Sequence, residues 1–240
     1  MKKLRNLILG VDLLMLCIAA GKIAEHKMLC MVSGMEGEVV NRPSMNVTDL
    51  STQDLVKKKV ALTFDDGPNA KYTEKLLEGL KERGVQATFF LLGERVERSP
   101  DIVKKMYTDG HLIGNHSYEH VNLSTLSDEA AVVQVNKTNE AIYKVTGEFP
   151  EYIRPPYGCW KSNLDYKTTM IEVLWNVDPL DWKTDNSDAV VQRVVSDVEE
   201  NDIILLHDAS ESSVNAAFQI VDKLQKDGYI FVTVDEILFD

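Results

Sequence analysis

The stretch that decides the fold is VALTFDDGP, residues 60–68. Its first five residues form a short apolar run of β-favouring side chains, and the Asp-Asp-Gly-Pro that follows is typical of the end of a strand. We therefore predict a strand whose C-terminal end carries two adjacent carboxylates, those of Asp65 and Asp66.

The chain after this strand alternates between helical and strand patterns. An amphipathic helix is predicted over 71–83, and Ser99-Pro100-Asp101 has the residue types of a helix N-terminus. Further strands are predicted at 87–93, 111–116, 152–156, 172–177, 202–207 and 229–234, and further helices at 127–146, 187–200 and 213–227. This spacing predicts parallel strands covered by helices in a single α/β domain, residues 59–240, with an open sheet and a barrel both allowed.

The composition of the 240-residue chain is that of a folded, acidic protein. Hydrophobic residues make up 44% of it, which is too apolar for a disordered chain. Lys and Arg number 26 against 38 Asp and Glu, which gives a net charge of −12. Nucleic-acid binding requires a basic face, so this function class is excluded. The three cysteines, Cys17, Cys30 and Cys159, contain no C-x-x-C pair and predict neither a disulfide framework nor a cysteine metal site.

The first thirty residues differ in charge from the rest. They contain five basic and two acidic residues, a net of +3, whereas the remaining 210 carry a net of −15. MKKLRN precedes an apolar run at 7–20, interrupted by Asp12, and this run is shorter than the about 20 residues of a spanning helix. We predict a signal peptide or N-terminal membrane anchor at 1–30 and a polar linker at 31–58.

This pattern indicates an exported protein that is extracellular or at the cell surface, with membrane attachment through residues 7–20 if the segment is retained. The alternative interpretation of the same apolar run is a buried N-terminal helix of the fold.

Titratable side chains gather at the predicted C-terminal ends of the strands. In parallel α/β proteins these ends meet at one rim, where functional groups lie. Five successive strand ends carry Asp65-Asp66, His116 with His120, Arg154 with Tyr157, Asp178 with Asp181 and Trp182, and His207 with Asp208. Each segment alone has an ordinary structural interpretation, such as a turn, a salt bridge or a core histidine, but together they predict a functional site.

The two histidines four residues apart, His116 and His120, are predicted to share one face of a helical turn. Neutral imidazole suits Zn²⁺, and a catalytic zinc typically takes two His and one carboxylate and leaves a position for water. Asp65 and Asp66 are both candidates for the carboxylate, and the residues alone do not choose between them.

The five segments together resemble the five motifs of the polysaccharide deacetylase family, the NodB-homology group or carbohydrate esterase family 4. They occur in the family's order, cover residues 60–235 and show no substitution at a motif position. The motifs are Thr63-Phe64-Asp65-Asp66-Gly67-Pro68, His116-Ser117-x-x-His120, Arg154-Pro155-Pro156-Tyr157, Asp178-x-x-Asp181-Trp182 and Leu205-x-His207. The resemblance implies a distorted (β/α) barrel rather than an open sheet.

The resemblance also implies a divalent metal, with Zn²⁺ expected and Co²⁺ as the alternative. Asp66, His116 and His120 would bind it. Asp65 would be the general base, and Arg154 would hold that carboxylate ionised and oriented.

The remaining motif residues are assigned to protonation of the leaving group, stabilisation of the oxyanion and binding of the acetyl group. By resemblance, His207 would be the general acid, kept protonated by Asp181. The Tyr157 backbone N–H would donate to the oxyanion, and Trp182 and Leu205 would wall the pocket for the acetyl methyl group. The roles of Asp178 and Asp208 stay open.

The activity implied by the resemblance is metal-dependent removal of N-acetyl groups from cell-wall polysaccharide containing N-acetylglucosamine. Peptidoglycan is the first substrate expected and chitin oligosaccharide the second. The alternatives are an O-acetyl esterase on acetylated xylan and a non-catalytic glycan-binding domain on the same fold. A metalloprotease is disfavoured because H-S-Y-E-H, residues 116–120, lacks the H-E-x-x-H placement of a general-base glutamate.

Overall fold

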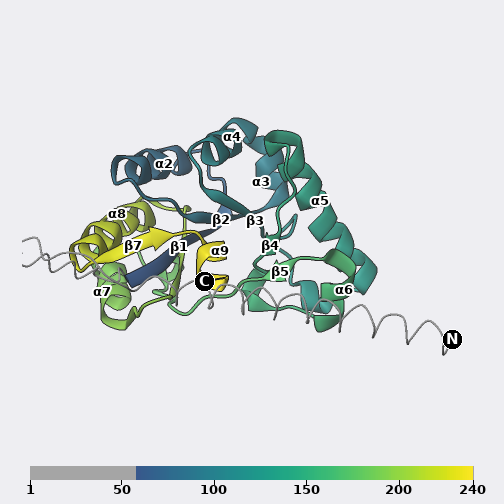
Figure 1. Cartoon of the computed structure of the whole chain (residues 1–240). Coiled ribbons are helices and arrows are strands. Elements are labelled where there is room, and N and C mark those ends of the chain that lie inside the picture. Colours follow the sequence, from purple (N-terminus) through teal and green to yellow (C-terminus); the bar gives the residue numbers. More distant parts are fainter. Residues whose placement is uncertain (1–57, 240) are drawn as a thin grey trace, which may run out of the picture. The chain divides into compact units, whose positions relative to one another are not determined.

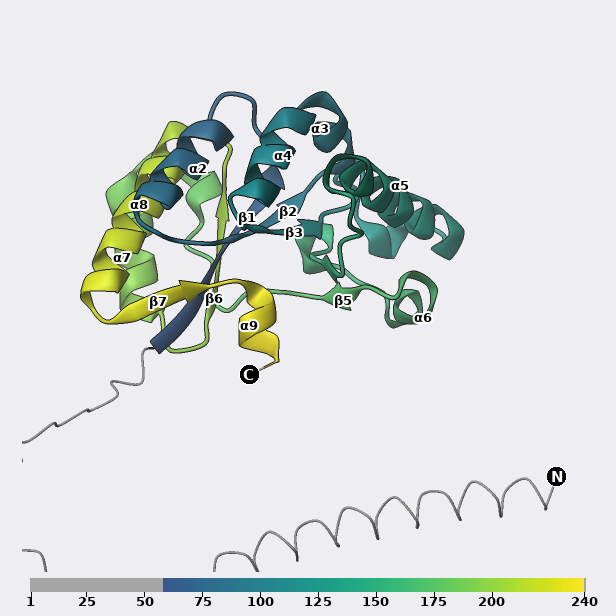
Figure 2. The same cartoon turned by 45° about the horizontal axis from the view of Figure 1, so that its top comes forward.

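The computed structural model describes residues 58–239. They form a curled sheet of parallel strands with helices along its outer side (Figures 1 and 2). The strands lie in the order β5-β4-β3-β2-β1-β6, and β7 pairs with the first half of β1. The chain that leaves β5 returns to the opposite edge through a bridge between Val177 and Ile204. The predicted distorted (β/α) barrel is confirmed.

The strands are β1 (Lys58–Gly67), β2 (Thr88–Leu91), β3 (Leu112–Asn115), β4 (Tyr152–Ile153), β5 (Ile171–Glu172), β6 (Ile203–His207) and β7 (Tyr229–Val232). The longer helices are α2 (Thr73–Glu82), α4 (Pro100–Thr108), α5 (Asp128–Thr146), α7 (Ser187–Asp197) and α8 (Glu211–Lys226). The shorter ones are α3 (Gly93–Arg98), α6 (Asp165–Thr168) and α9 (Val234–Leu238), together with single 3₁₀ turns at 123–125, 156–158, 162–164 and 181–183.

The central strand β1 is buried on both faces, as a parallel strand between helices and a barrel interior should be. Its alternate residues Val60, Leu62 and Phe64 belong to the large core that includes leucines of α2 and apolar residues of α8. Ala61 packs instead with Phe90 in a smaller cluster. The period of two therefore gives β1 a helix-facing side and an interior side.

The strand register brings the chemistry to one rim. Asp65 of β1 lies opposite Phe90 of β2 on one side and opposite His207 of β6 on the other. Asn115, directly before His116, lies opposite Leu91 of β2 and Ile153 of β4. The residues that end these strands are thus neighbours although they are far apart in the sequence.

The strand predicted at 172–177 is wrong over most of its length. Only Ile171–Glu172 pairs with β4, and Val177 makes one bridge to β6. The carbonyl groups of Val173 and Leu174 accept hydrogen bonds from the Arg154 side chain at 3.1 and 2.9 Å. Because these carbonyls face a guanidinium rather than a neighbouring strand, the segment leaves the sheet.

The other predicted elements are confirmed within a few residues, and three helices were not predicted. Ser127 caps α5 by accepting from the Ala130 N–H, and Gly147 ends it with φ of 84°. The short helices α3, α6 and α9 are too brief to give a periodic signal in the sequence.

Within residues 58–239, no helix is both long enough and apolar enough to cross a membrane. The predicted export segment at 1–30 lies outside the described residues, as does nearly all of the linker predicted at 31–58. The predicted domain boundaries therefore stay predictions.

Candidate active site

A cavity of about 780 Å³ opens at the C-terminal rim of the sheet. Ten of the residues singled out in the sequence line it: Asp65, Asp66, His116, His120, Tyr157, Asp178, Asp181, Trp182, Leu205 and His207. Arg154 lies behind the cavity wall and is fully buried. The five strand-end segments therefore form one site, as predicted.

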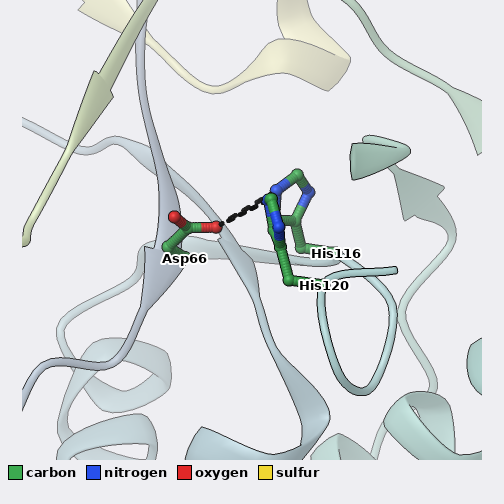
Figure 3. A group of neighbouring side chains, drawn as sticks. All are labelled: Asp66, His116 and His120. Carbon is green, nitrogen blue, oxygen red and sulfur yellow. Dashed lines mark ion pairs between the residues drawn. The ribbon is translucent and has the colours of Figure 1, made fainter. Parts of the chain in front are cut away.

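Asp66, His116 and His120 converge on a common point (Figure 3). Asp66 Oδ1 lies 3.3 Å from Nε2 of each imidazole, and the three ligand atoms are all within 4.8 Å of one another. Asp66 Oδ1 is buried and has no hydrogen-bond partner among the described residues. A buried carboxylate oxygen facing two imidazole nitrogens fits a divalent metal with nitrogen and oxygen ligands.

A β-bulge explains how Asp66 reaches this point. Successive side chains of a regular strand point to opposite faces, so Asp65 and Asp66 should diverge. The register between β1 and β2 shifts between Asp65 and Gly67, and Asp66 has φ of 69°. Such a bulge re-aims a side chain, and here it brings two adjacent carboxylates into the same cavity.

The imidazole of His116 is fixed by its second ring nitrogen. Nδ1 lies 2.6 Å from the carbonyl oxygen of Arg154 and therefore donates to it, since a carbonyl can only accept. In the tautomer that this bond selects, Nε2 carries no proton, and it faces Asp66. This arrangement, in which one nitrogen is held and the other is free to ligate, is the usual one for metal-binding histidine.

The helical turn predicted for His116 to His120 is wrong. Ser117 and His120 have φ of 66° and 57°, in the left-handed region, so the segment is an irregular loop. The two imidazoles still converge, with ring centroids 5.1 Å apart. The backbone after β3 turns too sharply for a helix because its peptide groups bond to α3 and α5.

The ionisation of Asp66 follows from its neighbours. Burial alone raises the pKa of this carboxyl group, but the contact with His116 at 3.3 Å and the positive charges that His116, His120 and His207 carry when protonated outweigh it and lower the pKa to about 2. Burial lowers the pKa of His120. An ionised carboxylate beside a histidine that tends to stay neutral is the protonation state that a metal requires of its ligands.

Asp65 has a different partner from Asp66. Its Oδ1 accepts from Arg154 Nη1 at 2.8 Å, and its Oδ2 lies 3.8 Å from His116 Nε2. The Arg154 Nη1 also donates to Thr63 Oγ1 at 2.7 Å. No role was predicted for Thr63, although the period of two places it on the same face of β1 as Asp65.

His207 and Asp181 form a partly buried, hydrogen-bonded pair in the same cavity. Asp181 Oδ1 accepts from His207 Nδ1 at 2.8 Å, and Oδ2 accepts from the His207 backbone N–H at 2.9 Å. Burial lowers the pKa of His207, but the hydrogen bond and charge of Asp181, with the charges of Asp65 and Asp66, raise it to about 9. The imidazole is therefore a cation at neutral pH, and Nε2 is its remaining donor.

Aromatic side chains form the mouth of the cavity. Tyr157 is 66% exposed, has φ of 62° and stacks edge-on against His120 with centroids 4.8 Å apart. Trp182 is 57% exposed, whereas Leu205 is buried in the wall. Trp175 also lines the cavity, and it was not predicted because the segment around it resembles an ordinary strand.

The two remaining aspartates of the motifs have structural partners. Asp178 Oδ1 accepts from the Leu180 N–H at 2.9 Å and closes a turn. Asp208 lies outside the cavity lining, fully buried, and accepts a hydrogen bond from Thr73; burial raises the pKa of Asp208 to about 6. A Cβ atom at Gly67 would lie 2.7 Å from Asp208 Oδ2, so this position of the Asp-Asp-Gly-Pro segment requires glycine.

Comparison with known proteins identifies the family. The family model described as polysaccharide deacetylase matches residues 52–173. The chain therefore belongs to the polysaccharide deacetylase family, as the motifs indicated. Proteins of this family depend on a metal, and Asp66, His116 and His120 form the candidate site for it in this chain.

The relatives include deacetylases of peptidoglycan. PdaC, a peptidoglycan-N-acetylmuramic acid deacetylase of Bacillus subtilis, is 40% identical over 200 residues, which cover 83% of this chain and 42% of PdaC. A peptidoglycan-N-acetylglucosamine deacetylase of Bacillus cereus is 40% identical over 185 residues, 74% of this chain and 67% of that protein. The chain thus spans less than half the length of PdaC.

Solved structures share the fold. The PdaC structure matches with a TM-score of 0.74 and 41% identity, covering 76% of this chain and 91% of that chain. A wild-type pseudoenzyme of carbohydrate esterase family 4 from Bacillus anthracis matches with a TM-score of 0.71 and 32% identity, covering 76% and 66%. Because the same fold includes a pseudoenzyme, activity has to be argued from the site.

Proposed function

We propose that this protein is a metal-dependent hydrolase that removes N-acetyl groups from cell-wall polysaccharide containing N-acetylglucosamine. One observation carries the proposal. Within a single cavity, two adjacent carboxylates have different partners, Asp66 two imidazoles and Asp65 a buried guanidinium, and a histidine with a raised pKa lines the same cavity. Titratable groups whose environments give them different protonation states at the same pH are typical of paired acid and base catalysis.

The metal site consists of Asp66, His116 and His120, and Zn²⁺ is the metal we expect, with Co²⁺ as the alternative. A divalent metal bound there supplies a Lewis acid for the acetyl carbonyl and for the attacking water. The protein's part is to hold one anionic and two neutral ligands in place, and the Arg154 carbonyl contributes by orienting His116.

Asp65 acts as the general base. Arg154 occupies its Oδ1, so Oδ2, the oxygen nearer His116, is the one that accepts the proton of the attacking water. The buried Arg154 guanidinium fixes the orientation of this carboxylate, and its bonds to Thr63 and to two carbonyl groups prevent it from moving away.

His207 acts as the general acid. The leaving nitrogen of an amide departs as a neutral amine only if it receives a proton, and His207 carries one at Nε2 because Asp181 holds the ring as a cation. As the C–N bond breaks, the nitrogen takes this proton and the acetyl carbon keeps the water oxygen. The products are acetate and a free amine.

Three residues receive the substrate. By resemblance to the family, the backbone N–H of Tyr157 donates to the oxyanion that develops on the acetyl oxygen. Leu205 and Trp182 line the cavity and provide apolar surface for the acetyl methyl group and the sugar ring.

Peptidoglycan is the substrate that the relatives favour, because the deacetylases from Bacillus subtilis and Bacillus cereus are named for it. The charge pattern of residues 1–30 agrees with this, since an exported protein meets the cell wall. We therefore propose export, with the protein either released or attached to the membrane through residues 7–20.

The second candidate is a non-catalytic glycan-binding domain, because the pseudoenzyme from Bacillus anthracis has the same fold. A binding domain has no need of an Asp65–Arg154 pair or of a charged His207. The full set of acid, base and candidate metal ligands in one cavity therefore favours the enzyme.

Acetate release tests the proposal. The full chain is incubated with peptidoglycan, N-acetylglucosamine oligomers and acetylated xylan, each with chelator and with added Zn²⁺ or Co²⁺. We expect metal-dependent release, fastest from peptidoglycan. Fastest release from xylan would make the protein an O-acetyl esterase. Retention of glycan under chelation with no release under any metal would establish the binding domain instead.

A further inference from the structure

The loop that carries two of the candidate metal ligands has a backbone that it would not keep on its own. Ser117 and His120 both have positive φ, which is unfavourable for residues with a side chain. Such a conformation persists only where surrounding contacts over-determine it. The contacts of the peptide groups between His116 and His120 therefore decide where the His120 imidazole lies.

One side of this loop is held by the start of α3. The carbonyl of Ser117 accepts from the Gly93 N–H at 3.1 Å, and the carbonyl of Tyr118 accepts from the Glu94 N–H at 3.2 Å. A Cβ atom at Gly93 would lie 2.4 Å from the Tyr118 ring, so the glycine allows this close approach. These bonds fix the carbonyl side of two peptide groups.

The Ser117 N–H donates to Asn115 Oδ1 at 2.7 Å, and the next two N–H groups of the loop are held by the side chain of Gln134 on α5. Its Oε1 accepts from two consecutive backbone N–H groups, those of Tyr118 at 3.1 Å and Glu119 at 3.0 Å. Its Nε2 donates to Glu119 Oε2 at 2.7 Å, which assigns the oxygen of the carboxamide to the loop. A single half-buried amide thus fixes the two peptide N–H groups that precede His120.

We propose that Gln134 is a positioning residue of the metal site, which sets the direction of the His120 imidazole through the peptide groups of Tyr118 and Glu119. The inference rests on the metal site of the proposed function. Gln134 touches neither the candidate ligands nor the cavity, and no motif includes it.

The loop remains attached when Gln134 is changed. The Tyr118 hydroxyl donates to Glu97 at 2.7 Å, and Lys137 Nζ lies 3.6 Å from the centroid of the Tyr118 ring. The α3 bonds to the loop carbonyls are also independent of Gln134. A substitution therefore loosens the orientation of the peptides without releasing the loop, and it affects metal binding more than folding.

The test measures metal binding by the full chain. Gln134→Leu should weaken the affinity for Zn²⁺ by about tenfold, the lower end of the losses seen when groups that orient metal ligands are removed. Zn²⁺ affinity is measured by competition with a chromophoric chelator, and the visible spectrum of the Co²⁺-loaded protein reports ligand geometry. Asn136→Leu, at an exposed position of the same helix, is the matched control and should behave as the native chain does.

A double variant separates positioning from a general effect on structure. Gln134→Glu combined with Glu119→Gln exchanges acid and amide, so a side-chain oxygen at 134 still accepts both N–H groups and an amide at 119 donates to it. This variant should recover native Zn²⁺ affinity and the native Co²⁺ spectrum. Native affinity in Gln134→Leu, or no recovery in the double variant, would overturn the inference. Absence of Zn²⁺ binding by the native chain would overturn the metal site itself, and this inference with it.

Discussion

Replacing Asp181 by Asn isolates the charge that makes His207 an acid. Asp181 accepts from both the ring and the backbone N–H of His207, at 2.8 and 2.9 Å. Burial is the largest single influence on the pKa of His207 and lowers it; the bond and charge of Asp181 reverse this and bring the pKa to about 9. Asparagine has one acceptor oxygen for these two N–H groups and carries no charge, so the pKa of His207 should fall to 6.5 or below.

The size of the effect follows from the two pKa values. At pH 7.5 a group with a pKa of 9 is about 97% protonated, and one with a pKa of 6.5 is about 9% protonated. Loss of the acid form alone therefore lowers kcat/KM by about tenfold at pH 7.5 and by little at pH 5.5. The alkaline limb of the pH profile should move from about 9 to about 6.5 or lower.

The same substitution has a pH-dependent effect on stability. A histidine whose pKa is raised in the folded state stabilises that state below its unfolded pKa, and this contribution is lost as the pH rises through the folded value. For His207 the window runs from 6.5 to about 9, and the contribution is about 3 kcal/mol below it. Asp181→Asn should therefore lower the free energy of unfolding more at pH 6 than at pH 9.5.

The assay is acetate release by the Zn²⁺-loaded full chain between pH 5 and 10, with urea unfolding at pH 6 and pH 9.5. Asp185→Asn is the matched control. Asp185 is an exposed residue of the cavity lining that makes no hydrogen bond to His207, so this substitution removes one charge from the cavity and leaves the His207 pair intact. An alkaline limb that stays near 9 in Asp181→Asn would refute the assignment of His207 as the acid held charged by Asp181.

Three further substitutions probe the other groups. Asp66→Ala should abolish Zn²⁺ binding and acetate release together, measured by metal analysis and turnover, and near-native turnover would contradict the metal assignment. Arg154→Met leaves Asp65 buried without its partner, so urea unfolding should show a loss of about 3–5 kcal/mol and kcat should fall; unchanged stability would contradict the pairing. Trp182→Ala should raise KM and leave kcat within a few-fold, and a fall in kcat alone would argue against a role in substrate binding.

Sequence reasoning located the site well because strand ends are a local signal. The Asp65-Asp66 turn and His207 each follow an apolar run, and in parallel folds such ends share a rim. The resemblance to the family then favoured the barrel over the open sheet and assigned different roles to Asp65 and Asp66. Neither choice follows from the period of the pattern.

The errors arose where long-range contacts determine the local backbone. The predicted strand at 172–177 is short because Arg154, distant in sequence, bonds to its carbonyl groups. The turn from His116 to His120 is not helical because α3 and Gln134 fix its peptide groups. The bulge at Asp66 is likewise a property of strand register, so no pattern within one strand could predict it.

The proposed deacetylase activity depends on one divalent metal bound in this cavity. The most direct measurement is a titration of the metal-stripped full chain with Zn²⁺, in which bound metal and acetate release from peptidoglycan are recorded together. We expect no acetate release at zero metal and a plateau at one bound equivalent of Zn²⁺. Release that is unaffected by stripping, or none with one equivalent bound and all three glycans tried, would contradict it.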